Sequence, residues 1–130
     1  MTPFGSYLES LRRSRRLKQK QLAALLQVNA CYVSAMESGK KGPPGDRVLQ
    51  RLIESLALNT DESSKLWEYV DQSQRTFRLP DDMALEEYAL ASHFRKRLGS
   101  LDKNQIAAID AVLRMGQASS EAMNTGGISA

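Results

Sequence analysis

The sequence predicts an all-α protein, and three observations support this prediction. Apolar residues recur at the three- and four-residue spacing of amphipathic helices along most of the 130-residue chain. No segment alternates apolar and polar residues as a half-buried strand does. Helix-ending signals separate the periodic segments, namely Gly39, the loop KKGPPG at 40–45 and Pro80. We therefore expect five helices in about the first 73 residues and two C-terminal helices after them.

The first three helices are predicted to be short. They are expected over about 4–15, 19–26 and 30–37. Asn29 is a suitable N-cap for the third helix, and Gly39 is suited to end it. The apolar faces of the first two helices are formed by Tyr7, Leu8, Leu11, Leu22, Ala23, Leu25 and Leu26.

The fourth and fifth helices complete a first domain, predicted over residues 1–74. The fourth helix is expected to end at Asn59, and Thr60 is expected to cap a fifth helix over about 61–73. Their apolar faces are formed by Val48, Leu49, Leu52, Ile53 and Leu56 on the fourth helix and Leu66, Trp67 and Val70 on the fifth.

A second region is predicted over residues 81–116. The segment RTFRLP at 75–80 breaks the helical pattern and is expected to be a linker, after which Pro80 and the Asp81–Asp82 pair open a sixth helix. Two amphipathic helices cannot bury their apolar faces alone, so they must pack on the first domain or on another subunit. Of the two, we expect dimerisation. The apolar faces comprise Ala84, Tyr88, Ala91, Phe94, Leu98, Ile106, Ile109 and Leu113.

The ends of the seventh helix follow from local signals. Asp102 with Gln105 three residues later predicts a capping box at its start. The small polar residues 117–130 predict a disordered tail.

Charge is distributed unevenly along the chain. Residues 1–51 hold ten Lys and Arg against three acidic residues, a net charge of +7. Residues 52–130 hold eight Lys and Arg against twelve acidic residues, a net charge of −4. A basic N-terminal half favours contact with a polyanion such as nucleic acid, and a solvated basic surface is the alternative.

Several classes of protein are disfavoured by the composition. No apolar run reaches the roughly 18 residues of a membrane span, and the first residues lack the pattern of a secretory signal. A single cysteine, Cys31, and a single histidine, His93, make neither a disulfide nor a metal site. There is no Gly-rich phosphate loop or paired ligand spacing. We expect a cytoplasmic protein that is not an enzyme and has no cofactor and no metal.

The residues at 19–37, QKQLAALLQVNACYVSAME, have the spacing of a helix-turn-helix. Two short helices that cross steeply over a turn of three or four residues need a small residue at their closest approach. Ala23 supplies this small residue opposite Val33, while Val28 fills the turn and Met36 ties the second helix to the core.

The segment LRRSRRLKQKQLAALLQVNACYVSAMESGKKGPPGDRVLQRLIESLAL at 11–58 resembles the Xre/Cro-type helix-turn-helix family, which includes phage repressors and many small bacterial regulators. The likeness covers about residues 4–73. It depends on Arg12, Leu17, Gln19, Leu22, Ala23, Glu37 and Gly39. Two positions depart from the pattern: Gln27 stands where glycine is common, in a turn that needs positive φ, and Lys18 replaces a Ser or Thr N-cap.

The resemblance implies a sequence-specific regulator of transcription that binds double-stranded DNA, acting as a homodimeric repressor at an inverted-repeat operator. Ala30, Cys31 and Ala35 would face the bases, and a salt-bridged Arg12–Glu37 pair would join the first and third helices. The DNA-binding positions implied are Arg13, Lys18, Gln19, Asn29, Ala30, Cys31, Tyr32, Ser34, Ala35, Lys40 and Lys41. Gln19, Lys40 and Lys41 would contact phosphate.

Alternatives remain at this point. The C-terminal helices could bind a toxin, which would make the protein an antitoxin, or form a ligand pocket. Sequence preference could come from DNA deformability or from Arg13 and Arg15 instead of small side chains packing on thymine methyl groups. Cys31 could be a redox sensor, although it has no second cysteine. Trp67 is expected to be apolar filler and His93 a surface or packing residue.

Overall fold

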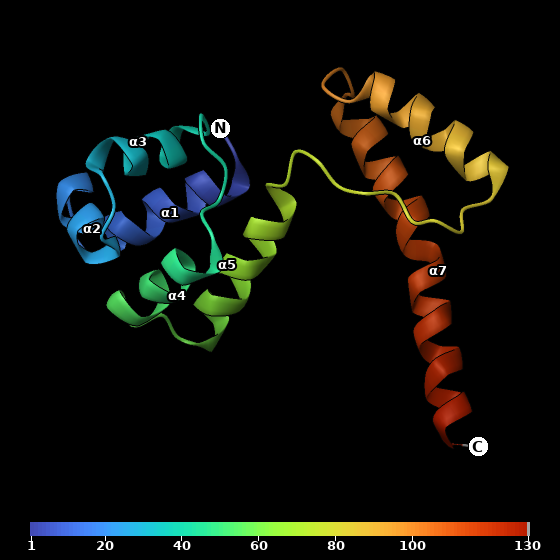
Figure 1. The fold of residues 1–130 in the computed structure, drawn as a ribbon. Helices are drawn as coiled ribbons and strands as arrows, with labels where there is room; N and C mark the ends of the chain where they lie inside the picture. The colour runs from blue at the N-terminus through green and yellow to red at the C-terminus, as the bar shows by residue number, and fades with distance from the viewer. Residues whose placement is uncertain (130) are drawn as a thin grey trace. The chain divides into compact units, whose positions relative to one another are not determined.

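The computed structural model describes the backbone of residues 1–129 and the side chains of residues 1–116 (Figure 1). All secondary structure in the described backbone is helical, so the predicted all-α class is confirmed. The chain forms two compact units that divide between Arg78 and Leu79, inside the segment predicted as a linker. None of the described helices is long and apolar enough to cross a membrane.

The helices follow one another along the chain as the sequence predicts. The first unit contains α1 (Pro3–Ser14), α2 (Gln19–Leu26), α3 (Ala30–Ser38), α4 (Asp46–Ser55) and α5 (Thr60–Gln72). The second unit contains α6 (Leu85–Arg97) and α7 (Lys103–Ser129).

Several helix ends differ from the predictions. Helix α1 begins at Pro3 because the Thr2 hydroxyl accepts a hydrogen bond from the Gly5 N–H at 3.0 Å. Helix α4 ends at Ser55, four residues before the predicted end, because Ala57 takes the left-handed conformation with φ 49°. The predicted cap of α5 was wrong by one residue, since Asn59 and not Thr60 occupies the cap.

The ends of α6 and α7 also differ. Asp81 and Asp82 lie ahead of α6, which starts only at Leu85, where the Glu87 carboxylate accepts the Ala84 N–H at 2.9 Å. The predicted capping box of α7 is present, with the Gln105 N–H donating to Asp102 Oδ1 at 2.8 Å. The helix runs on to Ser129, across the segment for which the sequence predicts a disordered tail. That segment holds no proline to end a helix, and its Ala, Glu and Met residues are helix formers.

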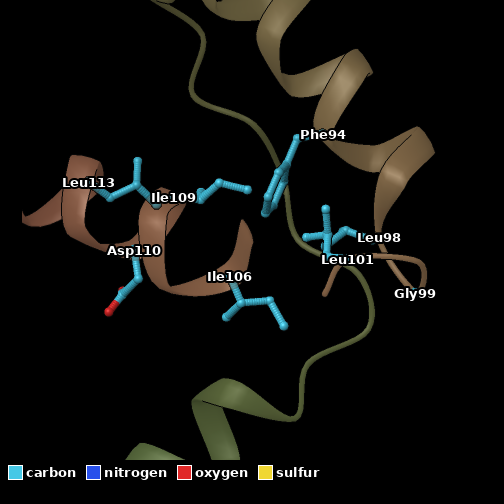
Figure 2. A pocket seen from close by; sticks show the side chains of 8 residues that line it. All are labelled: Phe94, Leu98, Gly99, Leu101, Ile106, Ile109, Asp110 and Leu113. Carbon is cyan, nitrogen blue, oxygen red and sulfur yellow. The ribbon is translucent and has the colours of Figure 1, made fainter. Parts of the chain in front are cut away.

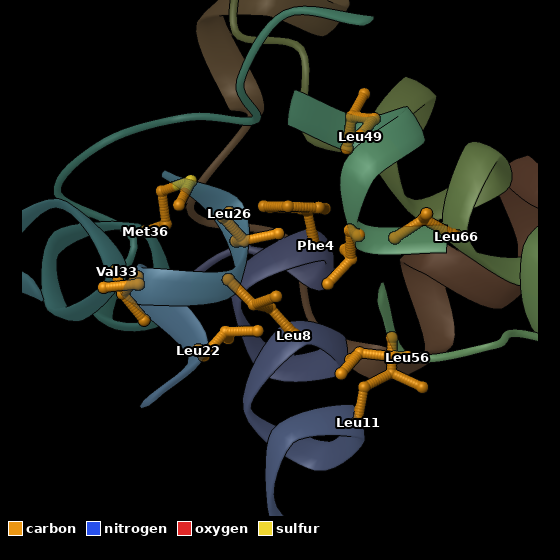
Figure 3. Close-up of a cluster of buried hydrophobic side chains, with 12 residues drawn as sticks. Phe4, Leu8, Leu11, Leu22, Leu26, Val33, Met36, Leu49, Leu56 and Leu66 are labelled. Carbon is orange, nitrogen blue, oxygen red and sulfur yellow. The ribbon is translucent and has the colours of Figure 1, made fainter. Parts of the chain in front are cut away.

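The hydrophobic core lies entirely in the first unit and joins all five of its helices (Figure 3). It consists of Phe4, Leu8, Leu11, Leu22, Ala23, Leu26, Val33, Met36, Leu49, Leu52, Leu56 and Leu66. Phe4, which the sequence reading missed, is 1% exposed. Trp67 was predicted to be buried and is 37% exposed, because Leu66 takes the inward position on α5.

The start of α1 contacts both α3 and the end of α5. Gly5 lies so close to α3 that a Cβ there would collide with the Met36 carbonyl oxygen. The hydroxyl of Ser73, buried at the end of α5, accepts the Phe4 N–H at 2.9 Å. The start of α1 is thus fixed between α3 and the end of α5.

The second unit has a different character. Within residues 79–116, no side chain is buried. The exposed large apolar side chains here are Leu79, Leu85, Tyr88, Leu90, Phe94, Leu98, Ile106, Val112, Leu113 and Met115. This helical pair has therefore no closed core of its own.

Candidate nucleic-acid interface

Helices α2 and α3 are joined by a tight turn (Figure 1). Gln27 ends α2 in the left-handed conformation with φ 58°, so the positive φ expected at this non-glycine position is confirmed. The Val28 N–H donates to the Ala23 carbonyl at 3.0 Å, and Val28 packs against the core. Asn29 then caps α3, its Oδ1 accepting the Cys31 N–H at 2.6 Å. The turn places α3 across α2 in the arrangement of a helix-turn-helix.

One face of α3 is fully occupied by the fold. Val33 and Met36 are completely buried, and Glu37 is 3% exposed. Ala30 and Tyr32 are half-buried and pack against the edge of the core. These two were expected among the DNA-contacting positions, and the structure places them at the border of the free surface.

The opposite face of α3 is open. Cys31, Ser34 and Ser38 are exposed and Ala35 is half-buried. These four residues follow the i, i+3, i+4, i+7 spacing of one helical face. Ser38 was missed by the sequence reading, although its position four residues after Ser34 could have indicated it. The exposed surface of this helix is thus made of small side chains that leave the backbone accessible.

A buried ion pair fixes the angle between α1 and α3. Arg12 Nε donates to Glu37 Oε2 at 2.8 Å, and a second guanidinium nitrogen donates to Glu37 Oε1 at 3.1 Å. Arg12 also donates to the Leu17 carbonyl at 2.8 Å. The hydrogen bond to Glu37 raises the pKa of Arg12 above its ordinary value. This is the pair that the family resemblance implies.

Gln19 extends this network to α2. Its side-chain amide donates to Glu37 Oε1 at 3.0 Å, and this hydrogen bond orients the amide. Gln19 is half-buried, so part of its side chain is exposed to solvent. At the start of α2, the Gln21 side-chain oxygen accepts the Lys18 N–H at 2.8 Å and so satisfies this backbone donor.

The arginines beside α1 have different surroundings. Arg15 donates to both carboxylate oxygens of Glu62, at 2.9 and 3.0 Å, and to the Leu56 carbonyl, at 3.1 Å. The Arg15 hydrogen bond, with the bond from Asn59, lowers the pKa of Glu62 to about 2. Arg15 thus joins α1 to α5 and to the end of α4. Arg13 is 71% exposed and pairs with Glu9 at 2.9 Å.

Positive charge follows the open face of α3 at its C-terminal end. Lys40 and Lys41 are exposed, and the Lys41 N–H donates to the Ala35 carbonyl at 3.1 Å. Gly39, with φ 86°, turns the chain there, and the Arg75 guanidinium donates to its carbonyl at 3.3 Å. Both lysines are thus held beside the helix end and not on a long loop.

Among the described residues, no three His, Cys, Asp or Glu side chains are grouped to hold a metal ion. His93 is an exposed residue of α6, in the second unit.

Comparison with known proteins agrees with this geometry. Residues 3–66 match the family described as a helix-turn-helix domain. Over 58 residues the chain is 38% identical to the HTH-type transcriptional repressor RghR of Bacillus subtilis (strain 168), a match that covers 45% of this chain and 43% of that protein. Over 52 residues it is 38% identical to the uncharacterized HTH-type transcriptional regulator RghRB of the same organism, covering 40% and 37%.

The matched regions span less than half the length of both relatives. No solved structure gives a significant match. Within the N-terminal unit, residues 3–66 thus match a helix-turn-helix domain, and α2 and α3 are the two helices that the turn at Gln27 joins.

Proposed function

We propose that the protein is a transcriptional regulator that binds a specific double-stranded DNA sequence through α3, and that it acts as a homodimeric repressor. The observation that carries this proposal is the free face of α3, formed by Cys31, Ser34, Ala35 and Ser38 on a helix whose other face is locked into the core. We also propose that the domain is of the Xre/Cro type, supported by the Arg12–Glu37 pair and the spacing of its first four helices.

The free face suits the major groove of DNA. A groove about 12 Å wide admits one helix, and small side chains let its backbone approach the base edges closely. Cys31 and Ala35 cannot form the bidentate hydrogen bonds of Arg or Gln, but their apolar surfaces can pack on thymine methyl groups. Ser34 and Ser38 supply hydroxyl groups for hydrogen bonds at the margin of the same face.

Charged and polar groups at both ends of the helix-turn-helix would hold the DNA backbone. Lys40 and Lys41 lie at the end of α3, and Lys18 and Gln19 lie at the start of α2. Such contacts fix the position and register of the protein on DNA without specifying sequence. Arg13, exposed on α1, is a further candidate for a phosphate contact.

A repressor of this kind would occlude a promoter as a dimer. A two-fold axis would place two α3 helices in successive major grooves, about 34 Å apart, and so would select an inverted repeat. Repression is supported by the similarity to RghR, which is described as a repressor. The open apolar surface of the second unit supports association with another protein chain.

A pool of randomised DNA duplexes tests this function directly. The full chain should enrich one inverted repeat whose half-sites are centred about 10–11 base pairs apart. Ser34→Arg should alter or abolish that preference without lowering the free energy of unfolding, because Ser34 is exposed on the free face. Lys65→Ala, a control on α5, should retain it. Failure of the folded chain to prefer any sequence over random duplex would refute the proposal.

A further inference from the structure

An open apolar groove runs along the second unit between α6 and α7. Its volume is about 570 Å³, and α6 supplies Glu87, Leu90, Phe94 and Arg97 to its lining. A smaller hollow of about 370 Å³ adjoins it, with Phe94 and Ile109 among its lining residues (Figure 2). No side chain of residues 79–116 is buried, so the apolar lining of the groove is open in the part of the unit whose side chains are described.

The α6 side of the groove has a symmetric order along the chain. Beyond the two ends of α6, the lining residues Met83 and Leu101 lie nine positions before and nine after position 92. Glu87 and Arg97 lie five positions on either side of it. Leu90 and Phe94 lie two positions on either side.

These matched positions also match in chemistry. If a second α6 lay antiparallel with its centre at the same position, each Glu87 would face an Arg97 and each Leu90 would face a Phe94. Glu87 and Arg97 would then meet as opposite charges and Leu90 and Phe94 as apolar side chains, while Ala91 and His93, which also line the groove, would face each other. A two-fold interface requires this kind of self-complementary surface.

The charges at the two ends of α6 could also be explained by the helix dipole. Acidic residues at a helix N-terminus and basic residues at its C-terminus also complement the helix dipole. The dipole accounts for the signs of Glu87 and Arg97, but it does not require both side chains to line the same apolar groove. Arg95, in the same last turn, is exposed and does not line it.

We infer that the groove is the homodimer interface, and that it takes α6 of a second copy in antiparallel orientation, centred near Ser92. Glu87 of each copy then lies opposite Arg97 of the other, and Leu90 lies opposite Phe94. The two helical pairs together close a four-helix bundle whose core neither pair has alone. This inference builds on the homodimer of the proposed function and adds its geometry.

Charge reversal in the full-length protein tests the arrangement, with association measured by sedimentation equilibrium in the absence of DNA. Arg97→Glu places two carboxylates together at both ends of the interface. It should raise the dimer dissociation constant by about tenfold or more, because two attractive pairs become repulsive. Arg95→Glu makes the same change in net charge two residues earlier on α6, outside the groove. It should leave the dimer dissociation constant within about twofold of wild type.

A compensating variant determines the orientation. The double change Glu87→Lys with Arg97→Glu exchanges the two charges within one chain. In the antiparallel arrangement opposite charges face each other again, so association should recover most of what Arg97→Glu lost. A parallel arrangement predicts that Arg97→Glu associates like wild type and that the double variant gains nothing. Glu87→Gln, which retains an oxygen acceptor for the Ala84 N–H, measures the loss of charge separately from the loss of the cap.

The remaining outcomes are also decisive. A wild-type chain that stays monomeric at high micromolar concentration overturns the inference. The groove would then be assigned to binding a different protein. Equal weakening by Arg97→Glu and Arg95→Glu overturns the proposed register. Because DNA is absent, either result leaves sequence-specific binding to be judged by duplex selection alone.

Discussion

Arg12 and Glu37 form a two-pronged ion pair that joins α1 to α3, with Nε to Oε2 at 2.8 Å and a second contact at 3.1 Å. The side chains are only 12% and 3% exposed, so solvent screens the pair weakly. Gln19 from α2 shares the same carboxylate. One buried carboxylate therefore sets the mutual orientation of the three helices that carry the proposed DNA interface.

Removal of this carboxylate should destabilise the N-terminal unit. Glu37→Ala leaves the Arg12 charge without its buried partner, and the free energy of unfolding should fall by about 3 kcal/mol. Glu9→Ala breaks the exposed pair with Arg13 and should cost less than about 1 kcal/mol. Urea denaturation followed by the fluorescence of Trp67, the single tryptophan, measures both. Equal losses in the two variants would contradict a structural role for Glu37.

Gly5 should be intolerant of a methyl group, although it lies within a helix. Alanine normally stabilises a helix interior relative to glycine. Here the added Cβ would collide with the Met36 carbonyl oxygen of α3, so Gly5→Ala should cost roughly 1–3 kcal/mol through separation of α1 and α3. Gly42→Ala, where a Cβ meets open space, should change the free energy of unfolding by less than about 0.5 kcal/mol. A Gly5→Ala protein with wild-type urea midpoint would show that this contact relaxes freely.

Glu62 should contribute an acid-dependent part of the stability. Its pKa is about 2 in the folded protein against an ordinary value of 4.5, chiefly because Arg15 hydrogen-bonds the ionised form. A lowered folded pKa stabilises the protein above the unfolded value, and the contribution disappears as pH falls from about 4.5 towards 2.

The variant Glu62→Gln isolates this contribution because it retains an oxygen acceptor for the Asn59 N–H. The wild-type free energy of unfolding should exceed that of the variant at pH 6 by about 1–2 kcal/mol. The two curves should converge near pH 2, as urea titrations across this range would show. Curves that stay parallel throughout would refute the linkage.

The pattern of apolar residues predicted every helix of the first unit because burial and helical period coincide there. The capping of α5 was misplaced since Asn59 and Thr60 are both good caps, and only the reciprocal bond with Glu62 distinguishes them. Trp67 was misassigned because it was counted on the apolar face by its residue type, whereas Leu66, about 100° away around α5, takes the inward position. The start of α6 was missed since Asp81 and Asp82 resemble cap residues, whereas the chain turns into the helix at Ala84.

The candidate site was only partly predictable, for a physical reason. Spacing placed Val33 and Met36 inward and so indicated the free face of α3. It could not reveal that Arg15 is held by Glu62, 47 residues away, because such a partner depends on the tertiary fold. Residue spacing also could not show that the Gln19 side chain donates a hydrogen bond to the buried Glu37 carboxylate.

Lys40 and Lys41 should bind DNA without regard to sequence. Both are exposed at the end of α3, where the chain would pass the sugar–phosphate strand. Lys40→Ala should weaken binding to specific and random duplexes alike and reduce the salt slope by about one unit. Lys65→Ala removes the same charge from α5 and should leave the slope unchanged. A Lys40→Ala protein with an unchanged slope but a different preferred sequence would assign this residue to base recognition instead.

Thymine methyl groups should carry part of the sequence preference. Cys31 and Ala35 present small apolar surfaces on the free face of α3, and neither can form a bidentate hydrogen bond to a base. Replacement of each half-site thymine by uracil removes only the methyl group. At least one position should then lose about 0.5–1 kcal/mol of binding free energy at fixed salt, the value of one methyl group kept from water.

The residue responsible can be identified by a double-mutant cycle. If Cys31 makes the contact, Cys31→Ser should bind more weakly to the thymine duplex and show a smaller loss on uracil substitution, because its hydroxyl packs less favourably on a methyl group. Ser38→Ala, on the same face, serves as the matched control and should retain the full loss. The competing explanation assigns base preference to Arg13 or to DNA deformability. It predicts no effect of uracil at any position. The variant Arg13→Ala then distinguishes readout by this arginine from readout by DNA deformability, since base preference disappears only if the arginine is responsible. Arg15 is the less available of the two arginines in that explanation, because its guanidinium is bound to Glu62 and to the Leu56 carbonyl.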